Sequence, residues 1–378
     1  MRFALFWHSL ILRGCHPSPT PAHTHAHAAI MTATTKLPFY LVLAFVVDED
    51  DEGEGGERSS GEAACPYRAP SGNPAAVVLI PRGTPLPLPY ASLAAEFAQS
   101  ETAFVEVGPG GREEGGRGEG AASSRQHGLR WFTPSGVEVG MCGHATLAAA
   151  AGLIEAGLAG EEARFATLSG GLSVVRDGGG GRGTFGLTLS LPARPPTDGL
   201  PPSTPALLDA VFGGSASPGQ RPTVIATAFN AALGYLVVEV GGGAAAVRRL
   251  APDPALLVAA TPGPPASAGD GRVAGLIVLA LERPNSPAGG ISWRFFGPWI
   301  GIAEDTATGS AAAVVAPWLL ARGLVGVLTK SLVETQPILC VRQLSPRGGA
   351  MRVWLAEGGS TVRVGARVSV RVRGEVEI

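Results

Sequence analysis

The sequence predicts an α+β protein of two pseudo-symmetric halves, each a curved, mostly antiparallel sheet wrapped around a central apolar helix. Three observations predict this fold: a motif that occurs twice, a nearly all-apolar helical segment after each copy, and β-type runs in both halves. With 378 residues, of which 45% are apolar, the chain can form a full core in each half. We expect the halves at residues 36–195 and 196–378.

The duplicated motif begins with an Arg-aromatic-Phe-x-Pro run. Its copies are Arg130-Trp131-Phe132-Thr133-Pro134 and Arg294-Phe295-Phe296-Gly297-Pro298. Each copy is followed by glycine, a polar residue and alanine, namely Gly143-His144-Ala145 and Gly309-Ser310-Ala311. A unit folded twice can face its copy across a cleft, so we expect His144 and Ser310 to converge on one ligand.

The first half contains β-type runs, helical segments and two insertions. Strands are predicted at residues 39–47, 74–80, 101–105 and 129–132, and helices at residues 90–99 and 143–156. Glu101 therefore lies at a helix-to-strand junction. Acidic or glycine-rich stretches, which cannot bury apolar surface, predict loop insertions at about residues 48–70 and 108–128.

The second half repeats this pattern. Strands are predicted at residues 224–229, 233–240, 273–281, 291–296 and 361–376, and a helix at residues 310–322. Pro317 should kink that helix. Gly178-x-Gly180-x-x-Gly183 fits a dinucleotide-binding pattern, but it stands between two strand-like runs with no helix after it, which favours a hairpin turn.

Residues 1–35 are expected to form an extension outside the globular part. An apolar patch is followed by a Pro/His/Thr tract, and Met31 is an alternative start. The segment is either disordered or a signal for an organelle or for secretion. The histidines at positions 23, 25 and 27 could bind a metal ion, but their place in a low-complexity tail favours a disordered segment.

Composition limits the partners. The net charge of −2 gives no reason to expect nucleic acid, and no apolar run reaches the ~18 residues that span a bilayer. The four cysteines are scattered without the spacing of a zinc site, which fits a reducing compartment and predicts no metal centre. We therefore expect a soluble, cytoplasmic protein, unless residues 1–35 direct it elsewhere.

The two motif helices suggest the chemistry of the site. Both are apolar nearly all round, so they should be buried, with unpaired N–H groups and a partial positive charge at their starts. Such ends favour a small anionic substrate carrying a carboxylate. Glu101 among apolar neighbours could exchange protons with it, and Glu304-Asp305 adds a carboxylate before the second motif.

Each of these residues also has a structural interpretation. His144 could cap its helix, Asp305 and Ser310 could form a turn and an N-cap, and Glu101 alone could be a surface carboxylate. Cys142 fits a packed apolar group better than a nucleophile. Ser310, His144 and Asp305 suggest a hydrolase triad, but the chain has no G-x-S-x-G elbow to support one.

Six ordered motifs resemble one known family, the PhzF-like isomerases of phenazine biosynthesis. They are Ser71-Gly72-Asn73-Pro74-Ala75-Ala76, Ser100-Glu101-Thr102-Ala103-Phe104, Arg130-Trp131-Phe132-Thr133-Pro134, Cys142-Gly143-His144-Ala145-Thr146, Glu304-Asp305-Thr306-Ala307-Thr308-Gly309-Ser310-Ala311 and Gln343-Leu344-Ser345-Pro346-Arg347-Gly348-Gly349. The resemblance implies a diaminopimelate-epimerase-like fold, no cofactor, a homodimer in many members, and isomerisation by moving a proton within a small unsaturated carboxylic acid.

The resemblance also implies roles for single residues. Glu101 matches the acid/base glutamate, and the substrate-binding positions are matched by Gly143, His144, Asp305, Gly309 and Ser310. The related epimerases use one cysteine from each half, whereas here Thr308 stands opposite Cys142, which disfavours a two-thiol racemase.

The chain departs from the family pattern at three places, which leaves the substrate open. They are Gly140, Thr306-Ala307 and Ala312-Ala313. We therefore weigh an isomerase against a catalytically silent relative that binds a metabolite or a protein through the same cleft.

Overall fold

The structure, a computed structural model, describes most of the chain from residue 34 onward. The described residues are 34–47, 71–108, 126–179, 183–196, 199–213, 221–261, 272–282, 290–324, 332–333, 336–356 and 358–378. The predicted extension up to residue 33, the predicted insertion at residues 48–70 and residues 109–125 of the insertion predicted at residues 108–128 lie outside them, as does Gly180. Residues 36–378 belong to one compact unit.

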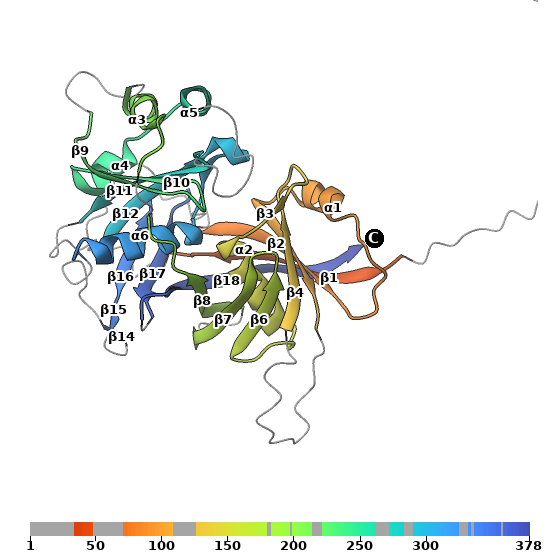
Figure 1. Ribbon diagram of the computed structural model, residues 1–378. Helices are drawn as coiled ribbons and strands as arrows, with labels where there is room; N and C mark the ends of the chain where they lie inside the picture. The colour runs from red at the N-terminus through yellow and green to blue at the C-terminus, as the bar shows by residue number, and fades with distance from the viewer. Residues whose placement is uncertain are drawn as a thin grey trace, which may run out of the picture. The chain divides into compact units, whose positions relative to one another are not determined.

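The first part of this unit contains eight strands and two helices among the described residues (Figure 1). The strands are β1 (Lys36–Ala44), β2 (Asn73–Ile80), β3 (Glu101–Glu106), β4 (Gln126–Phe132), β5 (Glu138–Val139), β6 (Glu162–Thr167), β7 (Gly170–Gly179) and β8 (Thr184–Pro192). The helices are α1 (Tyr90–Phe97) and α2 (Gly143–Glu155). β7 and β8 pair antiparallel, so the glycines at 178 and 183 belong to a hairpin, as the sequence predicts.

The second part adds the remaining elements. Its main strands are β9 (Val224–Asn230), β10 (Tyr235–Val240), β11 (Gly275–Leu281), β12 (Ile291–Gly297), β13 (Ile302–Asp305), β16 (Leu339–Gln343), β17 (Gly349–Leu355) and β18 (Thr361–Glu377). Two further strands, β14 (Leu332–Val333) and β15 (Gln336–Pro337), pair only with each other. The helices are α3 (Thr204–Gly213), α4 (Gly243–Arg248), α5 (Pro254–Ala260), the 3₁₀-helix η3 (Pro298–Ile300) and α6 (Gly309–Ala321).

The strand order confirms the internal repeat. The main sheet runs β1-β2-β3-β4-β6-β7-β8-β18-β17-β16-β12-β11-β10-β9. From either end, the second and third strands are parallel (β2–β3 and β10–β11), as are the fourth and fifth (β4–β6 and β12–β16), and the other pairings within each half are antiparallel. The short strands β5 and β13 pair with β4 and β12. The chain is thus an α+β protein of two like, mostly antiparallel halves.

The last strand joins the two halves. β18 pairs with β17 through residues 362–365, with β8 through residues 361–369 and with β1 through residues 368–377. These pairings close the strands of the first half into a ring around α2, and the strand can be followed in Figure 1 from β17 to β1. The position of residues 361–376 in the chain predicts that they belong to the second half, whereas the strand pairs with both halves. The division at residues 195 and 196 stays a prediction.

Both motif helices are buried, as their apolar sequences predict. α2 packs against β1, β2, β3, β8 and β18, and α6 packs against β8, β10, β17 and β18. Alternate residues of β10 and β11 point to opposite faces of the sheet, so that one set contacts the core around α6 while the other contacts α3, α4 and α5. The sequence did not predict these three short helices.

Pro317 lies inside α6, and the helix continues across it. Proline has no N–H to donate to the carbonyl four residues earlier, which is that of Ala313. The backbone N–H of Arg194 donates to this carbonyl instead, at 2.8 Å. The segment that links the two halves therefore satisfies the group that the proline leaves without a helical partner.

Two strands, β1 and β4, differ from the sequence prediction by three residues, whereas the other predicted boundaries agree within two. β1 spans Lys36–Ala44 rather than residues 39–47, because Phe45 has a left-handed backbone with φ of 62° and ends the strand. β4 begins at Gln126, so the last residues of the predicted second insertion are strand. His127 is therefore buried against Phe165, where burial lowers its pKa. Among the described residues, no helix is long and apolar enough to cross a membrane.

Candidate active site

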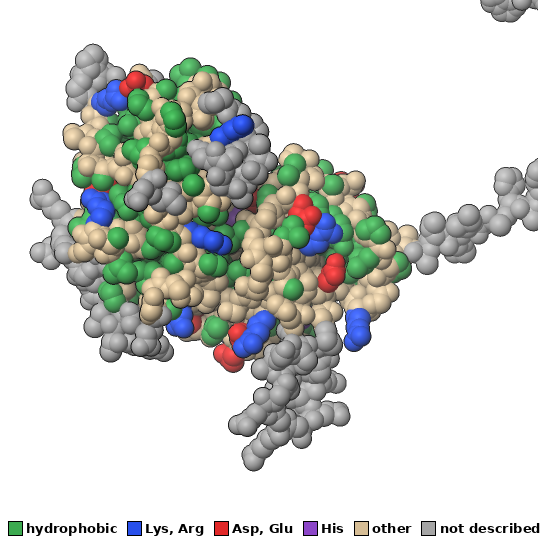
Figure 2. All heavy atoms as spheres, viewed as in Figure 1, with side chains coloured by type: hydrophobic (Ala, Val, Ile, Leu, Met, Phe, Trp, Pro, Cys, Tyr) green, Lys and Arg blue, Asp and Glu red, His purple; other side chains and the backbone are tan. Residues whose placement is uncertain are grey.

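The two motif helices begin at the same place. A Cβ atom on Gly143 would lie 3.6 Å from the Cα of Gly309, so the first turns of α2 and α6 touch through their glycines. Beside this contact is a cavity of about 280 Å³. All six predicted site residues line it, together with Cys142, Tyr235 and Thr308: they are Glu101, Gly143, His144, Asp305, Gly309 and Ser310. Figure 2 shows the surface hollowed between the two halves, with histidine atoms visible there.

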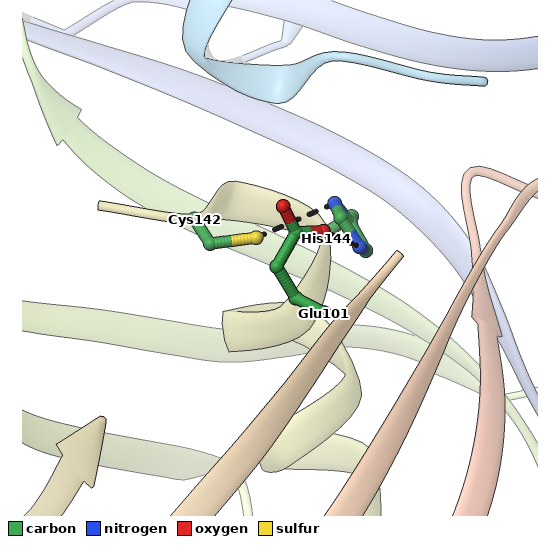
Figure 3. A group of neighbouring side chains, drawn as sticks. All are labelled: Glu101, Cys142 and His144. Atoms are coloured by element: carbon green, nitrogen blue, oxygen red, sulfur yellow. Dashed lines mark hydrogen bonds and ion pairs between the residues drawn. The ribbon is translucent and has the colours of Figure 1, made fainter. Parts of the chain in front are cut away.

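Glu101 and His144 form a buried pair on one side of the cavity. Glu101 is the first residue of β3, and its Oε2 lies 3.1 Å from Nε2 of His144, the second residue of α2 (Figure 3). Burial lowers the pKa of His144, but the hydrogen bond with Cys142 and the Glu101 carboxylate raise it by more, so that the pKa lies well above its usual value. The raised pKa favours the protonated imidazole ring, which faces the Glu101 carboxylate.

Asn73 connects this pair to the second half. Its side chain is fully buried at the start of β2, and its Nδ2 lies 2.8 Å from Oδ1 of Asp305, 3.0 Å from the carbonyl of Ala307 and 3.2 Å from Nδ1 of His144. Its Oδ1 accepts a hydrogen bond from Ser100 at 3.0 Å. Because an amide has two protons, we assign them to the two shorter contacts. Asn73 thus holds the two halves in register at the cavity.

Cys142 precedes α2 and completes the surroundings of His144. Its Sγ lies 3.4 Å from Nδ1 of His144, which can donate to the sulfur when the ring is protonated. Burial raises the pKa of the Cys142 thiol, and Glu101 raises it further. The thiol is therefore neutral at neutral pH, which fits a packed group and not a thiolate nucleophile.

Glu101, Cys142 and His144 could also hold a metal ion. Their potential ligand atoms lie within 4.8 Å of one another, and zinc accepts a carboxylate, a thiolate and an imidazole. Binding would require the thiol to lose its proton and the Glu101–His144 contact to open. Nδ1 of His144 contacts Sγ of Cys142, and Nε2 lies 3.1 Å from Oε2 of Glu101 without the geometry of a hydrogen bond, so the arrangement fits a buried ion pair better than a metal centre.

Asp305, at the end of β13, lines the cavity as well. Its Oδ2 accepts a hydrogen bond of 2.5 Å from the hydroxyl of Thr308, and burial raises its pKa although the nearby His144 opposes the rise. Gln343 fixes this turn, since its Oε1 accepts from the backbone N–H of Thr308 at 2.7 Å and its Nε2 donates to the carbonyl of Asp305 at 2.6 Å. The carboxylate is therefore held rigidly beside the start of α6.

Ser310, the second residue of α6, has a partner that the sequence did not reveal. Its Oγ lies 3.0 Å from the hydroxyl of Tyr235, the first residue of β10. In the sequence, Tyr235 is an ordinary residue of the strand predicted at residues 233–240. Only the structure shows that it lines the cavity. Asn73 was visible in a motif, but its contacts depend on residues more than 230 positions away.

The arginine of each repeated motif supports the site without lining it. Arg130 makes two hydrogen bonds to Glu138, at 2.8 and 2.7 Å, and Arg294 makes two to Glu304, both at 2.6 Å. Each guanidinium also lies over the phenylalanine two residues later, 5.1 and 4.9 Å from the ring centroid. These pairs fix β5 on β4 and β13 on β12, just before the chain enters the cavity.

Comparison with known proteins gives one consistent result. A family model described as phenazine biosynthesis-like protein matches residues 66–375. The human phenazine biosynthesis-like domain-containing protein is 31% identical over 264 residues, which cover 66% of this chain and 79% of that protein. A protein of Pseudomonas aeruginosa named as an uncharacterized isomerase is 32% identical over 309 residues, covering 82% of this chain and 94% of its own. A crystal structure of a PhzF family protein from Enterococcus faecalis has a TM-score of 0.60 at 25% identity, covering 91% and 100% of the two chains.

Proposed function

Because the chain belongs to the PhzC-PhzF family of phenazine biosynthesis-like proteins, we propose that it is a cofactor-independent isomerase that moves a proton within a small unsaturated carboxylic acid. Relatives in Pseudomonas aeruginosa are named as isomerases, which supports the reaction class. The observation that carries the proposal is a buried carboxylate, Glu101, beside two helix N-termini that meet at one cavity.

The substrate carboxylate binds first. The starts of α2 and α6 present backbone N–H groups and partial positive charge to the cavity, and protonated His144 adds a full charge. Together these groups offset the negative charge of Glu101 and Asp305, because two helix starts of about half a charge each and one imidazolium balance two carboxylates. A carboxylate of a few carbon atoms fits a cavity of about 280 Å³.

Glu101 then moves the proton. Its carboxylate takes a proton from the carbon next to the substrate carboxylate, so that a C–H bond breaks and the electron pair enters the conjugated system. The same group returns the proton to the far end of that system, where a new C–H bond forms, and the double bond moves by one position. No electrons are gained or lost overall, so the reaction needs no oxidant or reductant.

The difference between the halves supports a single base. The mates of Cys142 and His144 in the second motif are Thr308 and Ser310, and neither is a base near neutral pH. A racemase needs an acid and a base on opposite faces of its substrate, whereas a shift of a proton along one face needs only one group.

Deuterium incorporation tests the proposal. Small unsaturated acids, beginning with but-3-enoate and crotonate, are incubated with the protein in deuterated water and followed by NMR. The Glu101→Gln variant should keep its melting temperature and lose exchange by about 10²-fold or more. Glu106→Gln, at the other end of β3, is the matched control and should exchange normally. A folded Glu101→Gln variant that exchanges at the wild-type rate refutes the role of Glu101.

A second candidate function is binding without turnover. Gly140, Thr306-Ala307 and Ala312-Ala313 depart from the family pattern, and Gly140 lines the cavity itself. A catalytically silent relative would bind a metabolite or a protein partner through the same cavity. Tight binding of a carboxylate by a protein that exchanges no hydrogen in any acid of the panel would favour this function over the isomerase.

A further inference from the structure

The strand registers allow the two halves to be compared residue by residue. In the first half, Arg130 of the repeated motif pairs with Phe104 of β3. Three residues before Phe104 is Glu101, which pairs with Ala75 of β2. Glu101 therefore has a defined place relative to the motif.

The same place in the second half holds no acid. Arg294 pairs with Val278 of β11, and three residues before Val278 is Gly275. Gly275 pairs with Tyr235 of β10. The mate of Glu101 is therefore Gly275, and the mate of Ala75 is Tyr235.

No side chain fits at position 275 in this arrangement. A Cβ atom on Gly275 would lie 2.4 Å from Cζ of Phe295 and 3.1 Å from Cδ1 of Tyr235. The two rings pack edge to face, with centroids 5.1 Å apart. The ring of Phe295, with that of Tyr235 packed against it, thus occupies the space that a second catalytic carboxylate would need.

The hydroxyl of Tyr235 belongs to the same cavity as the Glu101–His144 pair. It lies 3.0 Å from Oγ of Ser310, and both residues line the cavity with Glu101. The pKa of Tyr235 is raised to about 12, mainly by burial and also by the nearby Asp305, although the hydrogen bond with Ser310 opposes the rise. The phenol therefore stays a neutral hydrogen-bond donor over the whole physiological range.

We propose that Tyr235 is a second catalytic residue, a hydrogen-bond donor to the substrate carboxylate that Ser310 orients. This inference rests on the proposed isomerase function. When Glu101 removes the proton, negative charge moves onto the carboxylate oxygens, and a donor already aimed at them stabilises that charge. The phenol keeps its proton throughout, so the first half supplies the base and the second half holds the developing charge.

Tyr235→Phe is the direct test, because it removes the hydroxyl and keeps the ring against Phe295 and Gly275. The matched control is Tyr90→Phe, another buried tyrosine, whose hydroxyl contacts Glu106 away from the cavity. With but-3-enoate, Tyr235→Phe should lower kcat about 10²-fold and change KM much less. Unchanged kcat, or a raised KM with normal kcat, would overturn the inference.

Binding of butyrate separates this inference from the proposed function. Butyrate has no double bond to move, so isothermal titration measures the carboxylate contact without turnover. If wild type fails to exchange but-3-enoate, the isomerase proposal fails for that acid, yet a Kd for butyrate about tenfold weaker in Tyr235→Phe than in Tyr90→Phe still supports the contact. Equal affinity of the two variants contradicts it.

Discussion

Gly309 lies against the ring of Phe45, which is fully buried and has a left-handed backbone. A Cβ atom on Gly309 would lie 2.9 Å from Cζ of that ring. Because the Phe45 side chain is fully buried in the core, the ring has little room to move away. The first turn of α6 can therefore lie this close to Phe45 only because Gly309 has no side chain.

Gly309→Ala should displace the start of α6 from the cavity. We expect a loss of about 1–3 kcal/mol in the free energy of unfolding, as for other overpacked positions, together with weaker carboxylate binding. Urea denaturation and butyrate titration measure the two effects. Gly160→Ala, where a Cβ atom meets nothing within 4 Å, should change stability by less than about 0.5 kcal/mol. Equal stability of the two variants contradicts the close contact.

The two motif arginines provide an internal comparison of a buried and an exposed ion pair. The Arg294 side chain is 9% exposed, whereas that of Arg130 is 39% exposed. Glu304→Gln should therefore cost about 3 kcal/mol, since it leaves a buried guanidinium without its charge partner. Glu138→Gln should cost about 1 kcal/mol or less. Chemical denaturation of both variants in parallel measures the two losses in the free energy of unfolding. Similar losses would show that burial of the ion pair does not determine its contribution to stability.

Stability should fall as pH rises above about 6.5. The pKa of His144 is raised in the folded protein, so protonated His144 stabilises the fold. This stabilisation is fully present below the pKa of the unfolded chain and is lost as pH rises through the folded pKa. Between the unfolded and the folded pKa, the native state holds one proton more than the unfolded chain. The free energy of unfolding then falls by up to about 1.4 kcal/mol per pH unit. Denaturation midpoints between pH 6.5 and 8.0 measure it.

His144→Gln is the control for this pH dependence and should flatten it. Burial lowers the pKa of His127, so this residue makes stability rise with pH, and only below pH 6.5. The Cys142 thiol affects stability only near pH 9 and above. Neither group changes the pH dependence between pH 6.5 and 8.0. An unchanged slope in His144→Gln would mean that another group carries the proton.

Asn73→Ala should destabilise the protein and disable the cavity together. It removes the donor to Asp305 and to the buried carbonyl of Ala307, at a cost of about 2–4 kcal/mol. Ser100→Ala removes one hydrogen bond to the same amide and should cost only about 1 kcal/mol. Thermal unfolding and butyrate binding distinguish the variants. An Asn73→Ala protein that binds butyrate normally would show that the halves need no such link.

Much of the fold could be predicted because the repeat is visible in sequence. Arg130 and Arg294 mark equivalent strands, and the apolar segments after them had to be buried helices. Glu101 could be placed at the cavity because the helix before it ends where its strand begins. These features are local, so spacing along the chain is enough to predict them.

Other features depend on pairing between distant residues. Tyr235 looks like any apolar strand residue until its pairing with Gly275 is known, and Asn73 acquires its role only when residues 305 and 307 lie beside it. The short helices α3, α4 and α5 escaped prediction because each is ten residues or fewer and lies among prolines and glycines. The pairing of β18 with both β1 and β8 likewise depends on distant strands and cannot be seen in the residue pattern of β18 itself.

β18 has a consequence for how the protein is made. During synthesis β1 to β8 leave the ribosome long before residues 361–377. The edges of β1 and β8 that pair with β18 therefore stay unpaired while the second half is still being translated. Bare strand edges promote association with other chains. A gene cut between the halves would therefore yield an insoluble N-terminal fragment, and solubility should return when the C-terminal fragment is expressed in the same cell.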